Sequence, residues 1–509
     1  MKTIFSRWFA RGKSRIERRL DKKKLTIGFE PQLSARNIHY EVSAKGGGIS
    51  CGGIGAMHLL AQRYGLINSI NQRLHLLKLY LPYHESDHVL NFAYNALCNG
   101  TCLQDIELRR NDENYLNALG AQTIPDPTTA GDFCRRFQAT DVEALIDAIN
   151  DARRRVWAEQ PDDFFDCATI DLDGTIVETT GSCKQGMDIS YNRIWGYHPL
   201  IVSLANTGEV LSIINRPGNR PSHEGAAREV DRAILLCLEA GYRTVLARGD
   251  TDFSQSKHLD GWNLIPRVRF IFGFDSMPNL VEIADNLPEK AWKRLERPAR
   301  YQVKTKPRQR PANVKDLIVK EREFDTLRLN SEEVAEFEYR PGACEVTYRM
   351  VVVRKNITKE KGEQALFDDI RYFFYITNEW EWNPDEIVFS ANDRCNQENL
   401  IAQLKGGVRA LQAPVNTLAS NWAFMVMTAL AWNLKAWWAL TLPDPPGRWQ
   451  QRHRDQKQWV LKLKFKSFLN AFVLLPCQII KTGRKLIYRL LSWNPHLDIF
   501  FRLINRLKC

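Results

Sequence analysis

The sequence lacks several features that would assign it to a structural class at once. Its eleven cysteines are scattered, and no Cys-x-x-Cys pair or Cys/His cluster has the spacing of a zinc site. This pattern indicates a reduced, intracellular protein without a structural metal. No internal repeat or low-complexity segment stands out. A composition of 44% hydrophobic and 26% charged residues excludes a disordered or fibrous protein.

Membrane and secretion signals are equally scarce. The basic residues 1–24 have no apolar core of the kind a signal peptide carries. The one candidate membrane span, Leu418 to Leu440, is interrupted by Asn421, Asn433 and Lys435. A helix buried in a large core fits this stretch better than a bilayer span. We therefore expect a soluble cytoplasmic protein with no membrane partner.

Positive charge is concentrated at the two ends of the chain. The chain has 71 Lys and Arg residues and 59 Asp and Glu residues. Residues 1–24 hold ten basic and two acidic side chains, and residues 446–509 hold fourteen basic and two acidic side chains. The overall net charge of +12 thus leaves −8 for residues 25–445. An acidic body with basic ends indicates a polyanionic partner, such as nucleic acid, held by the periphery.

The local patterns change along the chain. Residues 25–50 contain strand-like pieces (LTIGFE, IHYEV) and end in a glycine turn at 46–48, and residues 53–157 are helical, with Thr128-Thr129 capping one helix. After Phe164, apolar strands predict a mixed sheet covered by helices, and Pro199 to Asn215 reads as an antiparallel hairpin. The expected domains are a basic arm with a helical DNA-binding domain (1–160), the first part of the catalytic domain (161–279), a β-rich insertion (280–385), a Glu-bearing helix with closing helices (386–440) and a basic helical C-terminal region (441–509).

Acidic residues stand where chemistry would require them. Asp171 and Asp173 end one predicted strand, and Asp250 ends another. Glu398 is expected on a continuous helix, with Arg394 and Lys405 on the same face.

Each of these acidic residues alone has an ordinary structural explanation, as a turn cap or a surface ion pair. Carboxylates gathered from separate segments repel one another, however, and a divalent metal is the usual reason for such a cluster. Hard oxygen ligands suit Mg²⁺, and two such ions can promote phosphodiester transfer.

Three segments, IDLDGT, LARGDTDF and DRCNQENLIAQLK, resemble the motifs of bacterial insertion-sequence transposases with a DDE triad, and the branch numbered thirteen-eighty is the most similar. The resemblance extends over roughly residues 91–440 and includes the RPGN turn at 216–219. It implies a ribonuclease-H-like α/β fold and the catalytic, metal-binding triad Asp173, Asp250 and Glu398. It further implies two Mg²⁺ ions (or Mn²⁺ in their place).

The same resemblance implies a role for neighbouring residues and for partners. In the family's Tyr-Arg-Glu-Lys signature, Arg394 and Lys405 are the DNA-contacting residues, whereas the tyrosine position is Ala391 here. The implied partner is double-stranded DNA, as terminal inverted repeats and as target, bound by a homodimer associated with the nucleoid.

Alternatives remain open at this point. Asp171 could replace Asp173, and Asp252 could replace Asp250. DLDGT also matches haloacid-dehalogenase-type phosphatases, in which Asp171 would be the nucleophile, Asp173 the general acid/base and Asp250 a Mg²⁺ ligand. That fold needs a parallel βαβ unit after the motif, which the predicted hairpin contradicts. A catalytically inactive DNA-binding relative is the third reading.

Overall fold

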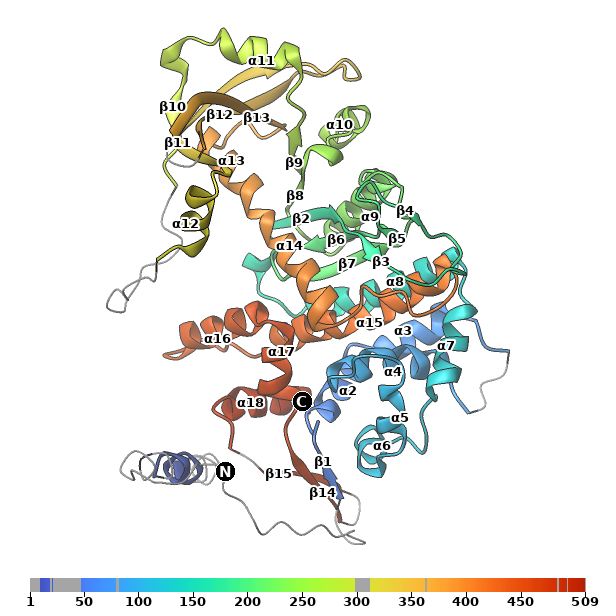
Figure 1. Cartoon of the computed structure of the whole chain (residues 1–509). Helices are drawn as coiled ribbons and strands as arrows, with labels where there is room; N and C mark the ends of the chain where they lie inside the picture. Colours follow the sequence, from blue (N-terminus) through green and yellow to red (C-terminus); the bar gives the residue numbers. More distant parts are fainter. Residues whose placement is uncertain are drawn as a thin grey trace. The chain divides into compact units, whose positions relative to one another are not determined.

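The chain forms two compact units. One is built from Met1–Glu159 together with Gln403–Cys509, and the other from Gln160–Ala402. The computed structural model describes residues 10–18, 21, 47–78, 82–297, 312–361, 364–482, 485–491 and 493–508 (Figure 1). The predicted strand-like segments LTIGFE and IHYEV lie outside these residues.

Helices dominate the first unit, as the pattern of residues 53–157 predicts. They pack around α15 (Leu418–Leu440), in which every residue from Ser420 onward is buried. This confirms the interpretation of that stretch as a core helix, and across the described residues no helix combines the length and apolar character needed to cross a membrane. Further helices of this unit are α2 (Ile54–Arg63), α3 (Leu66–Arg73), α4 (Glu85–Leu97), α5 (Asp105–Arg110), α6 (Glu113–Leu119), α7 (Pro127–Arg135), α8 (Ala139–Trp157), η4 (Gln403–Gly407), α16 (Gln450–Lys462), α17 (Phe465–Phe468), η5 (Leu469–Val473) and α18 (Leu497–Leu507).

The N-cap of α7 differs from the prediction. Asp126, and not Thr128 or Thr129, is the capping residue, because its carboxylate accepts a hydrogen bond from the Thr129 amide at 2.9 Å. Pro127 then occupies the first helical position, where a missing amide hydrogen costs nothing.

The C-terminal region is not wholly helical, which corrects the prediction for residues 441–509. It contains β14 (Cys477–Thr482) and β15 (Lys485–Leu490), which pair antiparallel. β14 also pairs with β1 (Gly47–Ile49), so residues expected in a glycine turn form a strand instead. This sheet joins segments that lie more than 400 residues apart, and local periodicity carries no signal for such pairing.

The second unit is organised by a nine-stranded mixed sheet, which confirms the predicted α/β class. β2 lies between β6, which is antiparallel to it, and β8, which is parallel. β6 and β7 form the predicted hairpin, and β9 is parallel to β8. The sheet order is β10-β11-β12-β13-β9-β8-β2-β6-β7. The strands are β2 (Cys167–Gly174), β6 (Leu200–Leu204), β7 (Glu209–Ile214), β8 (Thr244–Gly249), β9 (Val268–Phe274), β10 (Lys293–Arg294), β11 (Asp325–Tyr339), β12 (Tyr348–Lys361) and β13 (Gln364–Thr377).

The region predicted as a β-rich insertion extends this same sheet. β13 pairs antiparallel with β9, and β12, β11 and β10 continue from it. Two helices, α11 (Pro278–Asp285) and α12 (Val314–Glu321), accompany these strands.

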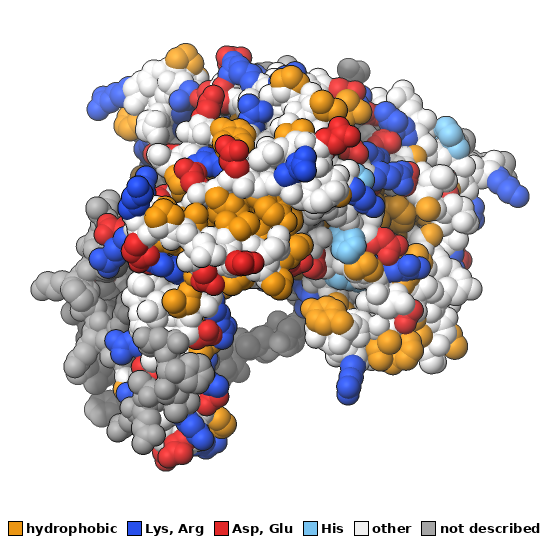
Figure 2. Space-filling model, turned by 90° about the horizontal axis from the view of Figure 1, so that it is seen from above, with side chains coloured by type: hydrophobic (Ala, Val, Ile, Leu, Met, Phe, Trp, Pro, Cys, Tyr) orange, Lys and Arg blue, Asp and Glu red, His pale blue; other side chains and the backbone are white. Residues whose placement is uncertain are grey.

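On the face shown in Figure 2, basic and acidic side chains are interspersed and hydrophobic side chains gather in a band among them, so charge of one sign is not segregated there.

Two sets of helices cover the central strands. α9 (Ala226–Glu239) packs against β2, β6 and β8, whereas α14 (Cys395–Ala402) contacts β2 and α13 (Pro384–Asp393) contacts β9 and β11 to β13 (Figure 1). Arg394, between α13 and α14, is 3.8 Å from the Asp173 carboxylate, so Asp173 points toward these helices. Ile387 and Val388 of α13 are buried in a cluster that includes Leu246 of β8. A further helix, α10 (Ser256–Asn263), precedes β9.

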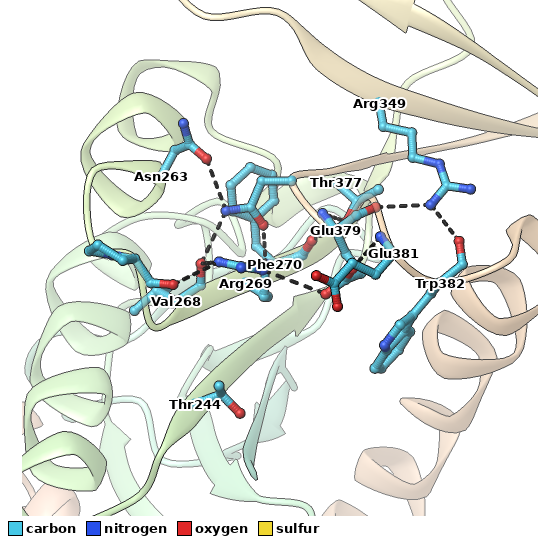
Figure 3. Close-up of polar contacts among 12 residues, drawn as sticks. Thr244, Asn263, Val268, Arg269, Phe270, Arg349, Thr377, Glu379, Glu381 and Trp382 are labelled. Carbon is cyan, nitrogen blue, oxygen red and sulfur yellow. Dashed lines mark hydrogen bonds and ion pairs between the residues drawn. The ribbon is translucent and has the colours of Figure 1, made fainter. Parts of the chain in front are cut away.

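A buried polar network fixes the point at which α13 begins (Figure 3). The Arg349 guanidinium donates to the carbonyls of Glu379 at 2.9 Å and Trp382 at 2.6 Å. The Asn378 side chain joins this loop to β9 by accepting from the Phe270 amide at 2.9 Å and donating to the Val268 carbonyl. The network lies at the amino end of β9, so α13 runs from that end of the sheet toward the opposite one.

Candidate functional site

Two aspartates meet at the carboxyl ends of adjacent parallel strands. Asp173 is the penultimate residue of β2, and Asp250 directly follows β8. Because β2 and β8 are parallel, both side chains lie at the same edge of the sheet. The Asp250 carboxylate also caps the short helix η2 (Thr251–Phe253) by accepting from the Asp252 amide at 3.1 Å.

Arg394 lies between these two aspartates. Its Nη1 is 3.8 Å from Oδ2 of Asp173 and 3.9 Å from Oδ2 of Asp250. This nitrogen is buried, and none of the described residues accepts a hydrogen bond from it. The guanidinium therefore balances two carboxylates at ion-pair distance without binding either one tightly.

The helix that carries Glu398 is interrupted, contrary to the continuous helix that was expected. α13 ends at Asp393, Arg394 is its C-cap, and α14 starts at Cys395. A π-helix, η4, then spans Gln403–Gly407 and contains Lys405, which is exposed and belongs to the first compact unit. The prediction that one regular helix carries Arg394, Glu398 and Lys405 is therefore wrong, because the turn at Arg394 and the wider π-helical turn both interrupt the 3.6-residue repeat.

Gln397 fixes the position of α14 on the sheet, and sequence reasoning missed it. Its side chain is buried, donates to the Ile201 carbonyl at 3.1 Å and accepts a hydrogen bond from Ser203 Oγ. Ile201 is the β6 residue paired with Asp173. The next residue along the chain, Glu398, is exposed and close enough to Asp173 to raise its pKa.

The electrostatics of the site disfavour several ionised carboxylates in the absence of cations. Burial raises the pKa of Asp173 to about 6; the Arg394 charge opposes this shift, whereas Asp250 and Glu398 add to it. Burial likewise raises the pKa of Asp250, against the effect of Arg394. The site thus concentrates negative charge that one arginine balances only in part.

The donor set suits a hard divalent cation, since all three acids supply carboxylate oxygens. As they stand, no three His, Cys, Asp or Glu side chains in the described parts of the chain are grouped closely enough to hold a metal ion. Arg394 takes the place of a counter-ion between Asp173 and Asp250. The carboxylate oxygens are thus of the kind that Mg²⁺ prefers, but the three side chains as placed do not form a metal site.

The alternative aspartates differ in their surroundings. Asp171 is 1% exposed and forms a two-point ion pair with Arg248, at 2.8 and 2.9 Å, and Arg248 also donates to the Ser390 carbonyl. Asp252 is exposed and lies in η2. Asp171 is held in a structural ion pair and Asp252 is exposed to solvent, which favours Asp173 and Asp250 as the functional pair.

One further expectation concerns a neighbouring side chain. Ala391, at the tyrosine position of the resembling family, is half-buried against the hydrophobic cluster of α13.

The phosphatase alternative requires a parallel βαβ unit after β2, but the next strand of the sheet, β6, is antiparallel. This topology removes the structural basis of that alternative.

Comparison with known protein families gave a match. The model of the family described as "Transposase DDE domain group 1" matches residues 31–509. A search of curated proteins found no match. Among solved structures, the cryo-EM structure of a piggyBac transposase synaptic complex with hairpin DNA is similar, with a TM-score of 0.37 and 10% identity over 84% of each chain.

Proposed function

Because the chain belongs to the family of transposase DDE domains, group 1, we propose that it is a bacterial insertion-sequence transposase that cleaves DNA at the ends of its element and joins them to target DNA. The observation that carries this proposal is the meeting of Asp173 and Asp250 at the ends of parallel strands, with Arg394 between them. Glu398 completes the proposed catalytic triad from the helix that Gln397 attaches to β6.

The topology supports a ribonuclease-H-like catalytic core. Three antiparallel strands, β2, β6 and β7, are followed by two parallel strands, β8 and β9, in the spatial order β7-β6-β2-β8-β9. The β-rich strands between β9 and the Glu398 helix would then be an insertion into that core. We assign the chain to the branch numbered thirteen-eighty on its three motifs.

The proposed mechanism uses the three acids to hold two Mg²⁺ ions, which when bound activate the attacking oxygen and stabilise the leaving oxygen of a phosphodiester. Asp173 must be ionised to contribute, and the raised pKa of its carboxyl favours a cation over an empty site at neutral pH. Arg394 and Lys405 would bind backbone phosphates beside the scissile bond. The Nη1 of Arg394, which donates no hydrogen bond to any described residue, supplies a donor for this contact.

The partners we propose are the terminal inverted repeats and the target DNA, bound by a dimer. The basic ends of the chain, with a net charge of +8 over residues 1–24 and +12 over residues 446–509, would hold the phosphate backbone without reading its sequence. Binding of this kind weakens steeply as salt rises.

The test is Mg²⁺-dependent cleavage of DNA that carries the element's ends. Glu398→Gln should abolish cleavage while leaving DNA binding intact, and Asp252→Asn, which removes an exposed carboxylate nearby, should cleave as the wild type does. Full cleavage by Glu398→Gln would exclude that residue as the third acid. If the wild type cuts no DNA but hydrolyses a phosphomonoester, the transposase proposal fails.

A further inference from the structure

The segment between β2 and β6 has no role in the site described above. Residues 175–199, here called the ribbon, contain β3 (Val177–Glu178), β4 (Asp188–Ile189) and β5 (Trp195–Tyr197), in the order β3-β5-β4. The ribbon prolongs the pairing of β2 with β6: the Thr175 amide donates to the Pro199 carbonyl at 3.0 Å, and the Thr179 amide to the Trp195 carbonyl at 3.0 Å. It is thus carried directly by the strand that bears Asp173.

The inner side of the ribbon is firmly packed. Tyr197 is buried, and its hydroxyl donates to the Gln185 carbonyl at 2.8 Å. A Cβ on Gly196 would lie 2.1 Å from the Val177 carbonyl oxygen, and one on Gly218 would lie 2.4 Å from that of Asp188. The RPGN turn, residues 216–219, is therefore in direct contact with the ribbon.

Arg216 stabilises that turn from inside the protein. Its guanidinium is buried and donates to the carbonyls of His198 at 2.9 Å, Ser222 at 2.8 Å and Glu224 at 2.7 Å. These bonds hold the chain on both sides of the turn. The ribbon accordingly rests on a rigid base.

The outer side presents aromatic rings and a cation to solvent. Trp195 is 52% exposed and Tyr191 is 83% exposed. Tyr191 lies within, and Trp195 shortly after, a turn closed by Ser190, whose carbonyl accepts from the Arg193 amide at 2.8 Å and whose hydroxyl accepts from the Ile194 amide at 3.1 Å. Arg193, also exposed, adopts the left-handed conformation with φ of +61°, which is strained for a residue with a side chain.

Aromatic rings beside a guanidinium bind nucleic acid in a recognisable way. Indole and phenol rings stack on unpaired bases, and arginine binds the adjoining phosphate. Trp195 is six residues along the ribbon from Ile201, the pairing partner of Asp173, which places it within about 20 Å of that residue. A single-stranded end of a few nucleotides can span this distance.

We infer that the ribbon is a DNA-binding surface, on which Trp195 and Tyr191 stack against unpaired bases next to the scissile phosphate and Arg193 binds the backbone. This inference rests on the proposed function and adds the class of DNA that the site prefers. The preferred ligand is a duplex end with several unpaired nucleotides.

The experiment compares the binding of blunt DNA ends with that of ends carrying a short single-stranded overhang. Trp195→Ala should weaken binding of the overhang DNA by roughly 5–100-fold, and binding of blunt DNA much less, because each stacked base contributes substantially to affinity. Tyr191→Ala, at a side chain too exposed to affect folding, should show the same selectivity. Arg193→Ala should reduce the slope of log affinity against log salt by about 1.

Trp380→Ala is the matched control. Trp380 is 53% exposed in the same unit, but it follows β13 at the amino end of β9, away from the ends of β2 and β8. It should leave both affinities unchanged. Equal losses from Trp195→Ala and Trp380→Ala, or no loss from either, would overturn the inference.

Two further outcomes separate this inference from the proposed function. If the wild type cleaves DNA in a Glu398-dependent manner but Trp195→Ala binds overhang DNA normally, the function stands and the ribbon is not its DNA surface. If sedimentation shows instead that Trp195→Ala disrupts self-association without changing DNA affinity, the ribbon binds a second copy of the chain and the inference is wrong.

Discussion

Asp173→Asn should stabilise the free protein at neutral pH while it removes a proposed catalytic ligand. The pKa of Asp173 is raised from 3.8 to about 6, so the folded state binds the proton more tightly than the unfolded chain. Below pH 3.8 the carboxyl is protonated in both states and costs nothing. Between pH 3.8 and 6 the cost of ionising it in the folded state accumulates, and above pH 6 the cost is complete. A pKa raised from 3.8 to about 6 corresponds to about 3 kcal/mol.

Calorimetry at pH 4, 6 and 8 tests this prediction. The advantage of the Asn variant should be small at pH 4 and should grow to roughly 6–12 °C in Tm at pH 8, given about 2–4 °C per kcal/mol for a unit of this size. Metal-free buffer is required, because a bound cation would offset the same repulsion. The comparison applies to the second compact unit, Gln160–Ala402, whose transition contains this site.

Asp171→Asn provides the opposite control on the same strand. Burial raises the pKa of Asp171 as well, so removing its charge relieves a desolvation cost, but the Arg248 guanidinium is then left buried without its ion-pair partner. That loss costs about 3–5 kcal/mol and outweighs the relief. This variant should therefore be less stable than the wild type at pH 8. If Asp173→Asn is also destabilised at pH 8, or if its advantage does not depend on pH, the electrostatic argument for the site is refuted.

Three further predictions concern other parts of the chain. Burial lowers the pKa of Lys435 to about 7, so the folded state releases this proton at lower pH than the unfolded chain does. The free energy of unfolding should therefore rise between pH 7 and 10.5 by up to about 1.4 kcal/mol per pH unit, and Lys435→Met should remove that slope in urea unfolding. Gln397→Leu should lower the free energy of unfolding by about 1–3 kcal/mol and reduce DNA cleavage. Adding Ser203→Ala should restore stability but not cleavage, because the double variant leaves no unpaired hydroxyl. Equal recovery of stability and cleavage, in denaturation and nicking assays, would contradict a positioning role for Gln397. Asp126→Ala should cost about 1 kcal/mol in Tm measurements through loss of the α7 cap, and Asp126→Asn should cost less.

Local patterns were sufficient to predict much of the second unit. The apolar run before Asp173, the hairpin of β6 and β7 and the strand before Asp250 all follow from short-range periodicity and turn signals. α15 has the same bounds as the apolar stretch from Leu418 to Leu440. In these segments the pattern of apolar residues along consecutive positions is enough to predict whether one face or every face of the element is buried.

The parts that were missed depend on tertiary contacts. The segment DRCNQENLIAQLK has no proline or glycine to signal the break at Arg394, which arises where α13 meets the sheet and α14 is attached to β6 by Gln397. Gln397 looks like any polar helical residue until its neighbours are known. The pairing of β1 with β14 is likewise invisible, because its two strands come from opposite ends of the sequence.

That pairing has a consequence for the order in which the protein can be made. The second unit is one continuous piece of chain, Gln160–Ala402, and can fold as soon as it has left the ribosome. The first unit needs residues from both sides of that piece, and β1 acquires its neighbour only when Cys477–Thr482 have been synthesised. An early stop codon or a stalled ribosome would therefore release a folded second unit without a completed first unit. Pulse-labelled nascent chains should show protease resistance in residues 160–402 well before residues 47–159.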